Sequence, residues 1–240
     1  MTDSTLNIDL TLRLGAITME AVRRLLALLC TAVCVTAVTL ALAPAAAAAG
    51  NPWFANMVGN ATQVVSVVST GGSKANMDVY QRTNAGWQPL AAGIPTFVGS
   101  AGMEPKAKSG YPATPMGVYS LDYAFGTAPN PGSGLRYVQV GPNHWWSGDD
   151  NSPSTFNTMQ VCQRDQCPFD TSASENLEIP QYKHAVVMGV NKQRTPGDGA
   201  AFFFHTTDGR PTEGCVAIDD ATLVKIIQWL KPGAVIAIAK

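Results

Sequence analysis

Short apolar runs of strand length, separated by turn sequences, dominate residues 50–240 of this 240-residue chain. Between the runs lie GGS, PNPGSG, TPGDG and TDGRP, whose glycine, proline, asparagine and aspartate residues favour turns. Runs of this length between turn signals are typical of β-strands. The predicted strands are 63–70, 77–81, 96–99, 117–121, 137–140, 185–190, 200–205 and 234–239. The sequence therefore predicts a mainly β domain.

One segment near the C-terminus has helical spacing instead. Its apolar residues recur three and four positions apart, and they are Leu223, Ile226, Ile227 and Leu230. Asp219 and Asp220 are suited to cap its start, and Pro232-Gly233 to end it. No repeat, charge block or low-complexity linker divides residues 50–240, so we expect a single domain with a short C-terminal helix.

The charge balance argues against a nucleic-acid partner. The chain has 16 Lys and Arg residues against 17 Asp and Glu, a net charge of −1, and only 14% of its residues are charged. A nucleic-acid-binding domain presents a strongly basic surface, because it must neutralise backbone phosphates. We therefore expect no nucleic-acid partner.

The N-terminal segment has the pattern of a secretory signal peptide. A pair of arginines precedes an apolar run over 25–43, and alanines fill 45–49 as the small residues that cleavage requires. We place cleavage after Ala49, with Met19 as a candidate true start, so that the mature chain spans 50–240 and is secreted or held in the cell envelope. The alternative is an uncleaved anchor, because the apolar run approaches the roughly 20 residues that cross a bilayer. In that case the chain contacts the membrane only through this segment.

Three cysteines remain once the signal segment is removed, and their number is odd. Cys162 and Cys167 are separated by four residues in the irregular stretch 144–180, and in an oxidising compartment we expect them to form a disulfide. The alternative is a metal-binding pair, although no second ligand pair of suitable spacing accompanies it. Cys215 is left as the unpaired thiol. Long irregular stretches such as 144–180 often form functional lids.

The unpaired thiol follows a histidine that ends an apolar strand. His205 closes the run FFFH, and Cys215 comes directly after Gly214. A thiol of pKa about 8.5 is only slightly ionised at pH 7, so a neighbouring imidazole would raise the reactive fraction and later return the proton. Gly214 would let a substrate carbonyl approach the backbone, where amide hydrogens near Cys215 could hold an oxyanion. Spacing alone leaves the alternative open that Cys215 is a small core residue and His205 a hydrogen-bonded strand-end histidine.

A longer stretch around this pair resembles a known family. The segment FFFHTTDGRPTEGCVAI is similar to the signature of the L,D-transpeptidase catalytic domain, the YkuD-like family of exported cell-wall enzymes. In that signature a histidine is followed by a variable loop and then by Ser/Thr-x-Gly-Cys. The segment TPMGVY at 114–119 resembles the family's TP-x-G-x-aromatic turn, and the similarity extends over about residues 63–239.

The resemblance implies a role for each residue of the motif. Cys215 matches the acyl-accepting nucleophile, His205 the general base, and Gly214 the family glycine. Thr206 matches the hydroxyl residue beside the base, and Thr212 matches the Ser/Thr of the Gly-Cys motif and is expected to contribute to substrate binding. The fold that the resemblance implies is a single catalytic domain of β-sandwich-like sheets with a short C-terminal helix.

The resemblance also implies a reaction. Members of the family attack the bond between the L-centre of a diamino acid and a terminal D-Ala in a peptidoglycan stem tetrapeptide, form a thioester, and pass the acyl group to an amine of a second stem. The implied partners are donor and acceptor stem peptides, and no metal or organic cofactor is involved. Two alternatives stay open: an L,D-carboxypeptidase, in which water resolves the same thioester, and a catalytically idle wall-binding module.

Two features depart from the family pattern. Many members carry a second histidine just before the Gly-Cys pair, where this chain has Glu213. A carboxylate there would disfavour a thiolate by like charge, unless it points outward or pairs with Arg210. The loop from His205 to Cys215 is also shorter than in many relatives, which leaves the position of the base relative to the thiol open.

Two further side chains are candidates for substrate binding. His184 begins the strand that, by the resemblance, lies beside the catalytic strand, and the alternative is a surface histidine at a strand start. Trp146, together with His144 and Trp145, could form an aromatic wall for a glycan or peptide, and the alternative is an ordinary core or lid cluster. The acidic run Asp149-Asp150-Asn151 lacks the spacing of a calcium loop, and a capped turn accounts for it.

Overall fold

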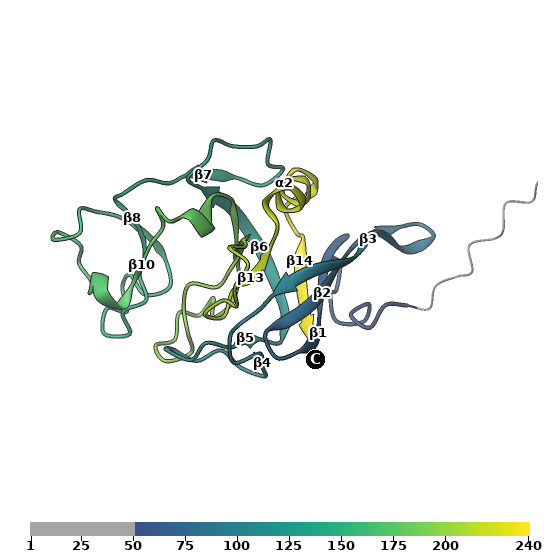
Figure 1. Ribbon diagram of the computed structural model, residues 1–240, viewed down its shortest axis with the longest axis horizontal. Coiled ribbons are helices and arrows are strands. Elements are labelled where there is room, and N and C mark those ends of the chain that lie inside the picture. The colour runs from purple at the N-terminus through teal and green to yellow at the C-terminus, as the bar shows by residue number, and fades with distance from the viewer. Residues whose placement is uncertain (1–50) are drawn as a thin grey trace, which may run out of the picture. The chain divides into compact units, whose positions relative to one another are not determined.

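Most of the strands join one large sheet that closes on itself. The computed structural model describes residues 51–240 (Figure 1), and in it nine strands are hydrogen-bonded in the order β11-β12-β13-β3-β2-β1-β14-β6-β7. β11 also pairs with β6, so the sheet forms a closed ring to which β7 is added. Its strands are β1 (Gln63–Gly71), β2 (Lys74–Thr83), β3 (Gly86–Phe97), β6 (Gly117–Gly126), β7 (Tyr137–Gln139), β11 (Ala185–Met188), β12 (Phe203–Thr206), β13 (Val216–Ile218) and β14 (Val235–Ala239).

Two smaller sheets and three short helices complete the described part of the chain. One sheet has the order β10-β8-β9, and the other pairs β4 with β5. The strands are β4 (Met103–Glu104), β5 (Thr114–Pro115), β8 (His144–Trp146), β9 (Met159–Val161) and β10 (Glu175–Asn176). The helices are the 3₁₀ turns η1 (Thr171–Ala173) and η2 (Pro180–Tyr182) and the α-helix α2 (Asp220–Trp229). The prediction of a mainly β domain with a short C-terminal helix is confirmed.

The largest buried cluster draws side chains from strands around the ring and from α2. Alternate residues of β1 and β2 enter it, among them Val65 and Val67 from one strand and Met77 and Val79 from the other. This period of two is typical of strands with one face in the core. Each such side chain stabilises the fold by about 1.5–3 kcal/mol relative to an exposed one.

Helix α2 forms where the sequence places its capping residue. The Asp219 carboxylate accepts a hydrogen bond from the backbone N–H of Thr222 at 2.9 Å, which satisfies one of the free amides of the first turn. Leu223, Ile226 and Ile227 are buried against the sheet. This apolar face fixes the helix beside β12, and its first residue, Asp220, is thereby brought close to the histidine strand.

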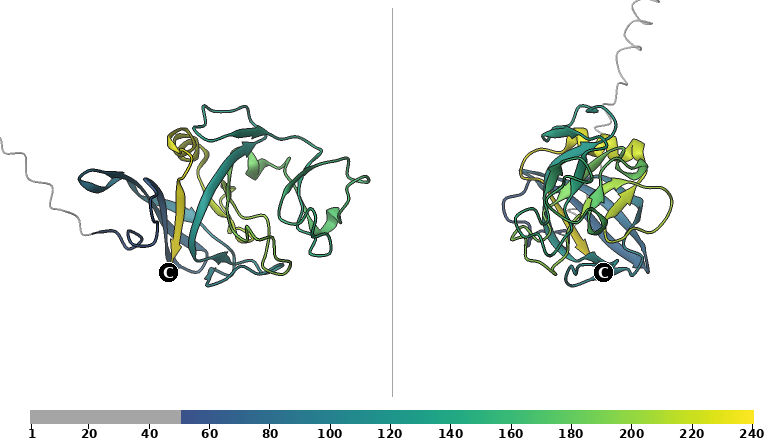
Figure 2. Two further views of the ribbon diagram at one scale, coloured as in Figure 1. Left: turned by 180° about the vertical axis from the view of Figure 1, so that it is seen from behind. Right: turned by 90° about the vertical axis from the view of Figure 1, so that its left-hand side faces the viewer.

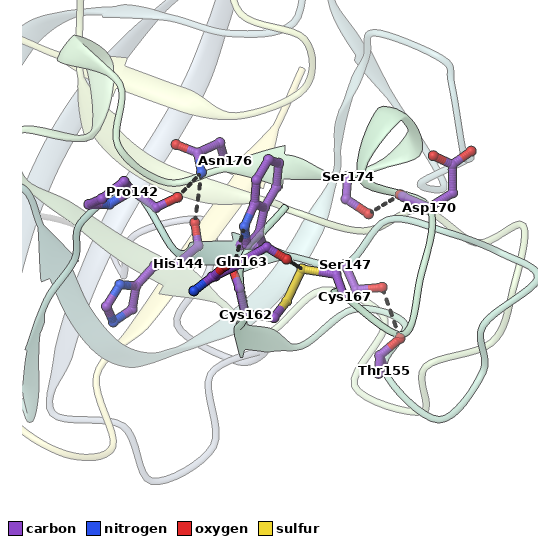
Figure 3. Close-up of a disulfide and its surroundings, with 11 residues drawn as sticks. Pro142, His144, Ser147, Thr155, Cys162, Gln163, Cys167, Asp170, Ser174 and Asn176 are labelled. Carbon is purple, nitrogen blue, oxygen red and sulfur yellow. Dashed lines mark hydrogen bonds between the residues drawn. A yellow bond between two sulfur atoms is a disulfide. The ribbon is translucent and has the colours of Figure 1, made fainter. Parts of the chain in front are cut away.

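The irregular stretch 144–180 is organised by the small sheet β10-β8-β9 and by a disulfide. Figures 1 and 2 show this sheet at the end of the domain opposite to the β2–β3 hairpin. Cys162 and Cys167 are bonded to each other, so the predicted disulfide is confirmed, and Cys215 is the free cysteine of residues 51–240. Figure 3 shows the disulfide and its surroundings, in which the Asn176 amide donates to the Pro142 carbonyl at 2.9 Å.

The acidic run of this stretch forms a capped turn. The carboxylate of Asp149 accepts hydrogen bonds from the backbone N–H of Asp170 at 3.0 Å and from the Ser152 hydroxyl at 2.7 Å. These donors, the Asp170 amide first, hold the pKa of Asp149 below its ordinary value. Residues 51–240 contain no cluster of side chains that could hold a metal ion.

The predicted signal peptide lies outside the described residues. Within residues 51–240, no helix combines the length and the apolar character that crossing a bilayer demands. The buried clusters of the described residues lie between Phe54 and Ile238, and residues 51–240 form one compact unit. Residues 50–240 therefore have a core of their own and are the natural fragment for experiments.

Candidate active site

Two parallel strands bring the predicted base and nucleophile to one face of the sheet. β12 carries His205, which lies opposite Ala217 of β13, and Cys215 precedes Ala217 by two positions. Because side chains two positions apart point to the same face, Cys215 lies on the same side as the histidine ring. All three residues line a cavity of about 500 Å³, together with Glu175, Tyr182 and Thr212.

Cys215 is buried and its sulfur is held by the backbone. The residue is only 6% exposed. Its Sγ accepts a hydrogen bond from the backbone N–H of Phe203 at 3.3 Å and lies 3.4 Å from the Ala201 carbonyl, which can accept the thiol proton. Burial is the main cause that raises the pKa of Cys215, and the charge of Glu175 adds to it. The resting site therefore holds a neutral thiol that needs a base before it can attack.

The turn before the cysteine is fixed by two threonine hydroxyls. Thr212 donates its hydroxyl to the Cys215 carbonyl at 2.7 Å and accepts the Gly214 N–H at 3.2 Å, while Thr114 donates to the same carbonyl at 3.1 Å. The Gly214 amide is thus engaged by Thr212 and is not free for an oxyanion. A side chain at Gly214 would be strained, because its φ is +133° and a Cβ would lie 3.0 Å from the Phe202 ring.

His205 is a neutral ring at the wall of the cavity. Its Nδ1 lies 2.8 Å from the Thr206 carbonyl, so Nδ1 carries the proton and Nε2 has the free electron pair. Burial lowers the pKa of His205, which keeps the ring unprotonated at neutral pH. Within residues 51–240 the ring makes no hydrogen bond to the Cys215 sulfur, although both face the same cavity.

Thr206 and His184 meet on the other side of the histidine strand. The Thr206 hydroxyl donates to the Asp220 carboxylate at 2.8 Å, and the His184 Nδ1 lies 2.7 Å from the same oxygen. Lys183 pairs with the second oxygen at 2.6 Å. Thr206 therefore supports His205 through its backbone carbonyl and not through its hydroxyl. His184 is buried and does not line the cavity, so its predicted substrate contact stays a prediction.

Asp220 is held in its charged form by these three partners. Burial works against the charge, but the hydrogen bonds from His184, Lys183 and Thr206 outweigh it and lower the pKa of Asp220 to about 2. A carboxylate with a lowered folded-state pKa stabilises the fold above its ordinary pKa, and this contribution disappears as the pH falls through the folded value.

Replacing Asp220 by asparagine is expected to destabilise the fold by about 2 kcal/mol at pH 7, because the shift from 3.8 to about 2 corresponds to that energy. The difference is expected to shrink between pH 4 and pH 2, where the native carboxylate takes up a proton. Urea unfolding of both proteins across this range measures it. The matched control is Asp208→Asn, since the pKa of Asp208 is also about 2 through its pairing with Arg210, but the residue is exposed to solvent. A difference for Asp220→Asn that persists unchanged at pH 2 would contradict the charge-based explanation.

Trp146 lies behind the cavity wall. Its ring packs edge-on against Phe203 at a centroid distance of 5.0 Å, and its Nε1 donates to the Asn157 side chain at 2.9 Å. It shares a buried cluster with Cys215 but does not line the cavity of about 500 Å³. Its contact with substrate therefore stays a prediction, and the core-cluster alternative describes its position here.

Glu213 lines the cavity and points into solvent. The residue is exposed, and Arg210 pairs with Asp208 at 2.6 Å instead of with Glu213. Its charge contributes least among the causes that shift the pKa of Cys215, whereas Glu175 is the larger carboxylate effect.

The structure places two residues at the thiol that the sequence analysis did not single out. The Tyr182 hydroxyl donates to the Glu175 carboxylate, and both residues line the cavity together with Cys215. No sequence signal marks this triplet, because its members are joined by folding across three separate elements.

These observations define a class of site: a buried cysteine and a neutral histidine on parallel strands of a mainly β domain, facing one cavity. A model of the L,D-transpeptidase catalytic domain family, YkuD, matches residues 58–238. The chain belongs to this family, and the resemblance of its histidine and Gly-Cys motif is thereby confirmed.

Among solved structures, this chain is similar to the crystal structure of Mycobacterium tuberculosis L,D-transpeptidase 1. The two share 10% sequence identity with a TM-score of 0.33, and the similarity covers 74% of this chain and 63% of that chain. This chain thus matches less than two thirds of that relative's length. No curated protein matches the sequence.

Proposed function

We propose that this protein is an extracytoplasmic L,D-transpeptidase that cross-links peptidoglycan stem peptides through a thioester on Cys215. The observation that carries the proposal is the joint presence of Cys215 and neutral His205 at one cavity, in a chain whose residues 58–238 match the family. The cavity of about 500 Å³ is of the size that holds a peptide segment.

In the first half-reaction the Cys215 sulfur attacks the carbonyl carbon at the L-centre of the donor stem. A carbon–sulfur bond forms, the amide bond to the terminal D-Ala breaks, and the departing D-Ala nitrogen takes a proton. In the second half-reaction an amine of another stem attacks the thioester, the new amide bond forms, and the sulfur regains a proton. His205 takes the thiol proton at Nε2 as the general base and gives it to the departing D-Ala nitrogen, and in the second half-reaction it carries a proton from the incoming amine to the sulfur.

In this scheme, the turn that contains Thr212 and Gly214 positions the nucleophile. The Thr212 hydroxyl is hydrogen-bonded to the Cys215 carbonyl and the Gly214 amide, so it fixes the backbone from which the Cys215 side chain projects. It also lines the cavity, which is why we retain it as a substrate-binding residue. The family resemblance is the basis for proposing that Thr212 contacts substrate. It is also the basis for proposing donor and acceptor stem peptides as the partners.

The test is incubation of purified residues 50–240 with a disaccharide tetrapeptide from peptidoglycan, followed by mass analysis of the products. Cross-linked dimers together with free D-Ala are expected for the wild-type protein, and neither for Cys215→Ala. Tripeptide products without dimers would show that the function is that of an L,D-carboxypeptidase and not that of a transpeptidase. Unchanged substrate, with wall binding that does not depend on Cys215, would instead favour the idle wall-binding module.

A further inference from the structure

The thiol proton of Cys215 points to a backbone carbonyl and not to a side chain. Cys215 donates to the Ala201 carbonyl over a sulfur–oxygen distance of 3.4 Å, while the Phe203 N–H donates to the same sulfur at 3.3 Å. The two contacts have opposite effects, because a carbonyl that accepts the proton stabilises the neutral thiol and an N–H that donates stabilises the thiolate. The position of the Ala201 carbonyl therefore bears directly on the nucleophile.

Ala201 has a backbone conformation that few alanines adopt. Its φ is +61°, in the left-handed region where a Cβ is crowded by the backbone. Four non-glycine residues of 51–240 have a positive φ, and three of them, Asn191, Arg194 and Ala201, lie in the segment that leads to β12. The fourth is Asn157. Such conformations persist where the surrounding contacts enforce them, so the next step is to find what holds Ala201.

The side chain of Asn157 connects both ends of this segment. Its Oδ1 accepts the Ala201 N–H at 3.3 Å and the Nε1–H of Trp146 at 2.9 Å. Its Nδ2 donates to the Val190 and Asn191 carbonyls, each at 3.0 Å. An asparagine amide accepts two hydrogen bonds and donates two, so its full capacity is used here. Asn157 thus fixes the Ala201 amide relative to β8, which carries Trp146, and relative to the start of the segment.

We propose that Asn157 is a positioning residue for the nucleophile: it holds Ala201 in the left-handed conformation, and the Ala201 carbonyl in turn holds the Cys215 thiol in its neutral form. The two contacts share one residue, because Asn157 binds the N–H of Ala201 and Cys215 binds its carbonyl. Within residues 51–240, Asn157 makes no hydrogen bond to the sulfur itself, so it acts through Ala201.

This hold explains how the thiol stays neutral while it lies at the same cavity as its base. Cys215 and His205 both line the cavity, so the thiol proton passes to His205 Nε2 once the S–H bond turns from the Ala201 carbonyl towards the ring. A neutral thiol is a weak nucleophile and resists oxidation, so the hold protects Cys215 until substrate binds. The role in acyl transfer rests on the proposed function, whereas the hold on the thiol does not, because it can be measured without substrate.

The segment contains a matched control for a merely structural role of Asn157. Asn191 also has a positive φ, +50°, and its side chain donates to the Thr195 and Gly199 carbonyls at 2.9 and 2.8 Å. None of its side-chain hydrogen bonds reaches Ala201. Glycine adopts a positive φ readily, so Asn157→Gly and Asn191→Gly each remove the side-chain contacts and keep the backbone conformation.

The first experiment records the infrared S–H stretching band of Cys215 in purified residues 50–240. With Cys162 and Cys167 joined, Cys215 is the one cysteine of residues 51–240 that has an S–H bond. A thiol that donates a hydrogen bond absorbs at a lower frequency than a free thiol. The wild-type band is expected at the lowered frequency, Asn157→Gly is expected to shift it to that of a free thiol, and Asn191→Gly is expected to leave it in place. A wild-type band at the free-thiol frequency would overturn the proposal.

The second experiment measures the rate at which iodoacetamide alkylates Cys215 at pH 7. Asn157→Gly is expected to accelerate alkylation by about two- to tenfold, the factor to which the net free energy of one hydrogen bond corresponds. Asn191→Gly is expected to react at the wild-type rate. The double variant Asn157→Gly/Ala201→Gly is expected to return towards the wild-type rate, because glycine at position 201 takes the positive φ without being held. General loosening of the segment predicts the reverse, since a second glycine would then accelerate alkylation further.

The charged and titratable groups that face the sulfur from the cavity wall are the same in all these variants: Glu175, Tyr182, His205, Asp208, Arg210 and Glu213. An unchanged band and rate in Asn157→Gly, equal acceleration by Asn191→Gly, or further acceleration in the double variant would overturn the proposal.

A second variant covers the case in which Asn157→Gly fails to fold by circular dichroism. Asn157→Asp keeps an acceptor for the Ala201 amide and loses the donors to the Val190 and Asn191 carbonyls. Its S–H band is expected at the wild-type frequency, and a band at the free-thiol frequency would count against the proposal. A protein that gives the expected bands and rates but yields no muropeptide products would refute the proposed function and leave the role of Asn157 standing.

Discussion

A carbapenem is expected to add one drug mass to wild-type residues 50–240 and none to the Cys215→Ala variant. β-Lactams of this class acylate the catalytic cysteine in the family that the chain belongs to. The sulfur attacks the lactam carbonyl, the ring amide opens, and the lactam nitrogen takes the proton, so the adduct retains every atom of the drug. Intact mass spectrometry after incubation measures it, and complete loss in Cys215→Ala is the largest effect we expect.

The selectivity of this result follows from the state of the cysteines. Cys162 and Cys167 are joined, so Cys215 is the one cysteine of residues 51–240 that can carry an adduct. Alanine in a site that already buries the thiol leaves the surrounding packing nearly unchanged, which makes the variant a suitable control. An adduct that persists in Cys215→Ala would contradict the assignment. A folded wild-type protein with a titratable free thiol and no adduct would shift the function towards the idle wall-binding module.

The fold was predictable where a strand shows a clear apolar or alternating run. β2 carries apolar side chains at alternate positions, β1 and β14 are nearly continuous apolar runs, and α2 carries its own cap and helical spacing. The small sheet was not predictable, because β8, β9 and β10 have only two or three residues each and such runs show no period. The pairing of β11 with β6 that closes the ring is a long-range contact that local patterns do not encode.

The candidate site was predictable to the extent that one motif carries it. His205, Thr212 and Cys215 lie in one segment, and the parallel pairing of β12 with β13 brings them to one cavity. The hydroxyl of Thr206 was assigned to the same site, although neighbouring residues of a strand face opposite sides. Since His205 faces the cavity, Thr206 faces Asp220 instead.

Two carboxylates raise the pKa of the Cys215 thiol, and the sequence analysis singled out the one with the weaker effect. Glu213 drew attention because it replaces a family histidine next to the nucleophile in sequence. In the folded chain it is exposed, and Glu175, which is 40 positions before Cys215, has the stronger effect on the thiol pKa. Proximity in sequence is a poor guide to electrostatics here, because the small sheet and the turn η2 deliver Glu175 and Tyr182 from elsewhere.

Replacing His205 by glutamine is expected to lower the rate of muropeptide cross-linking by about 10²–10⁴-fold, the usual contribution of a positioned acid–base group. Glutamine has a similar size and can still donate to the Thr206 carbonyl, but it takes up no proton at neutral pH. The wild-type rate is expected to hold as the pH falls through 6.5, the ordinary pKa of histidine, and to decline only at lower pH, because burial lowers the pKa of His205. The initial rate of dimer formation as a function of pH measures both effects.

The matched control for this variant is His184→Gln, which changes the other buried histidine of the region. His184 is bound to Asp220 on the far side of β12, so its replacement is expected to lower stability while leaving the acid limb of the rate profile in place. A raised KM for His184→Gln would support its predicted contact with substrate. Cross-linking by His205→Gln at the wild-type rate and with the wild-type pH profile would show that the ring is only a packed core residue and would contradict its acid–base role.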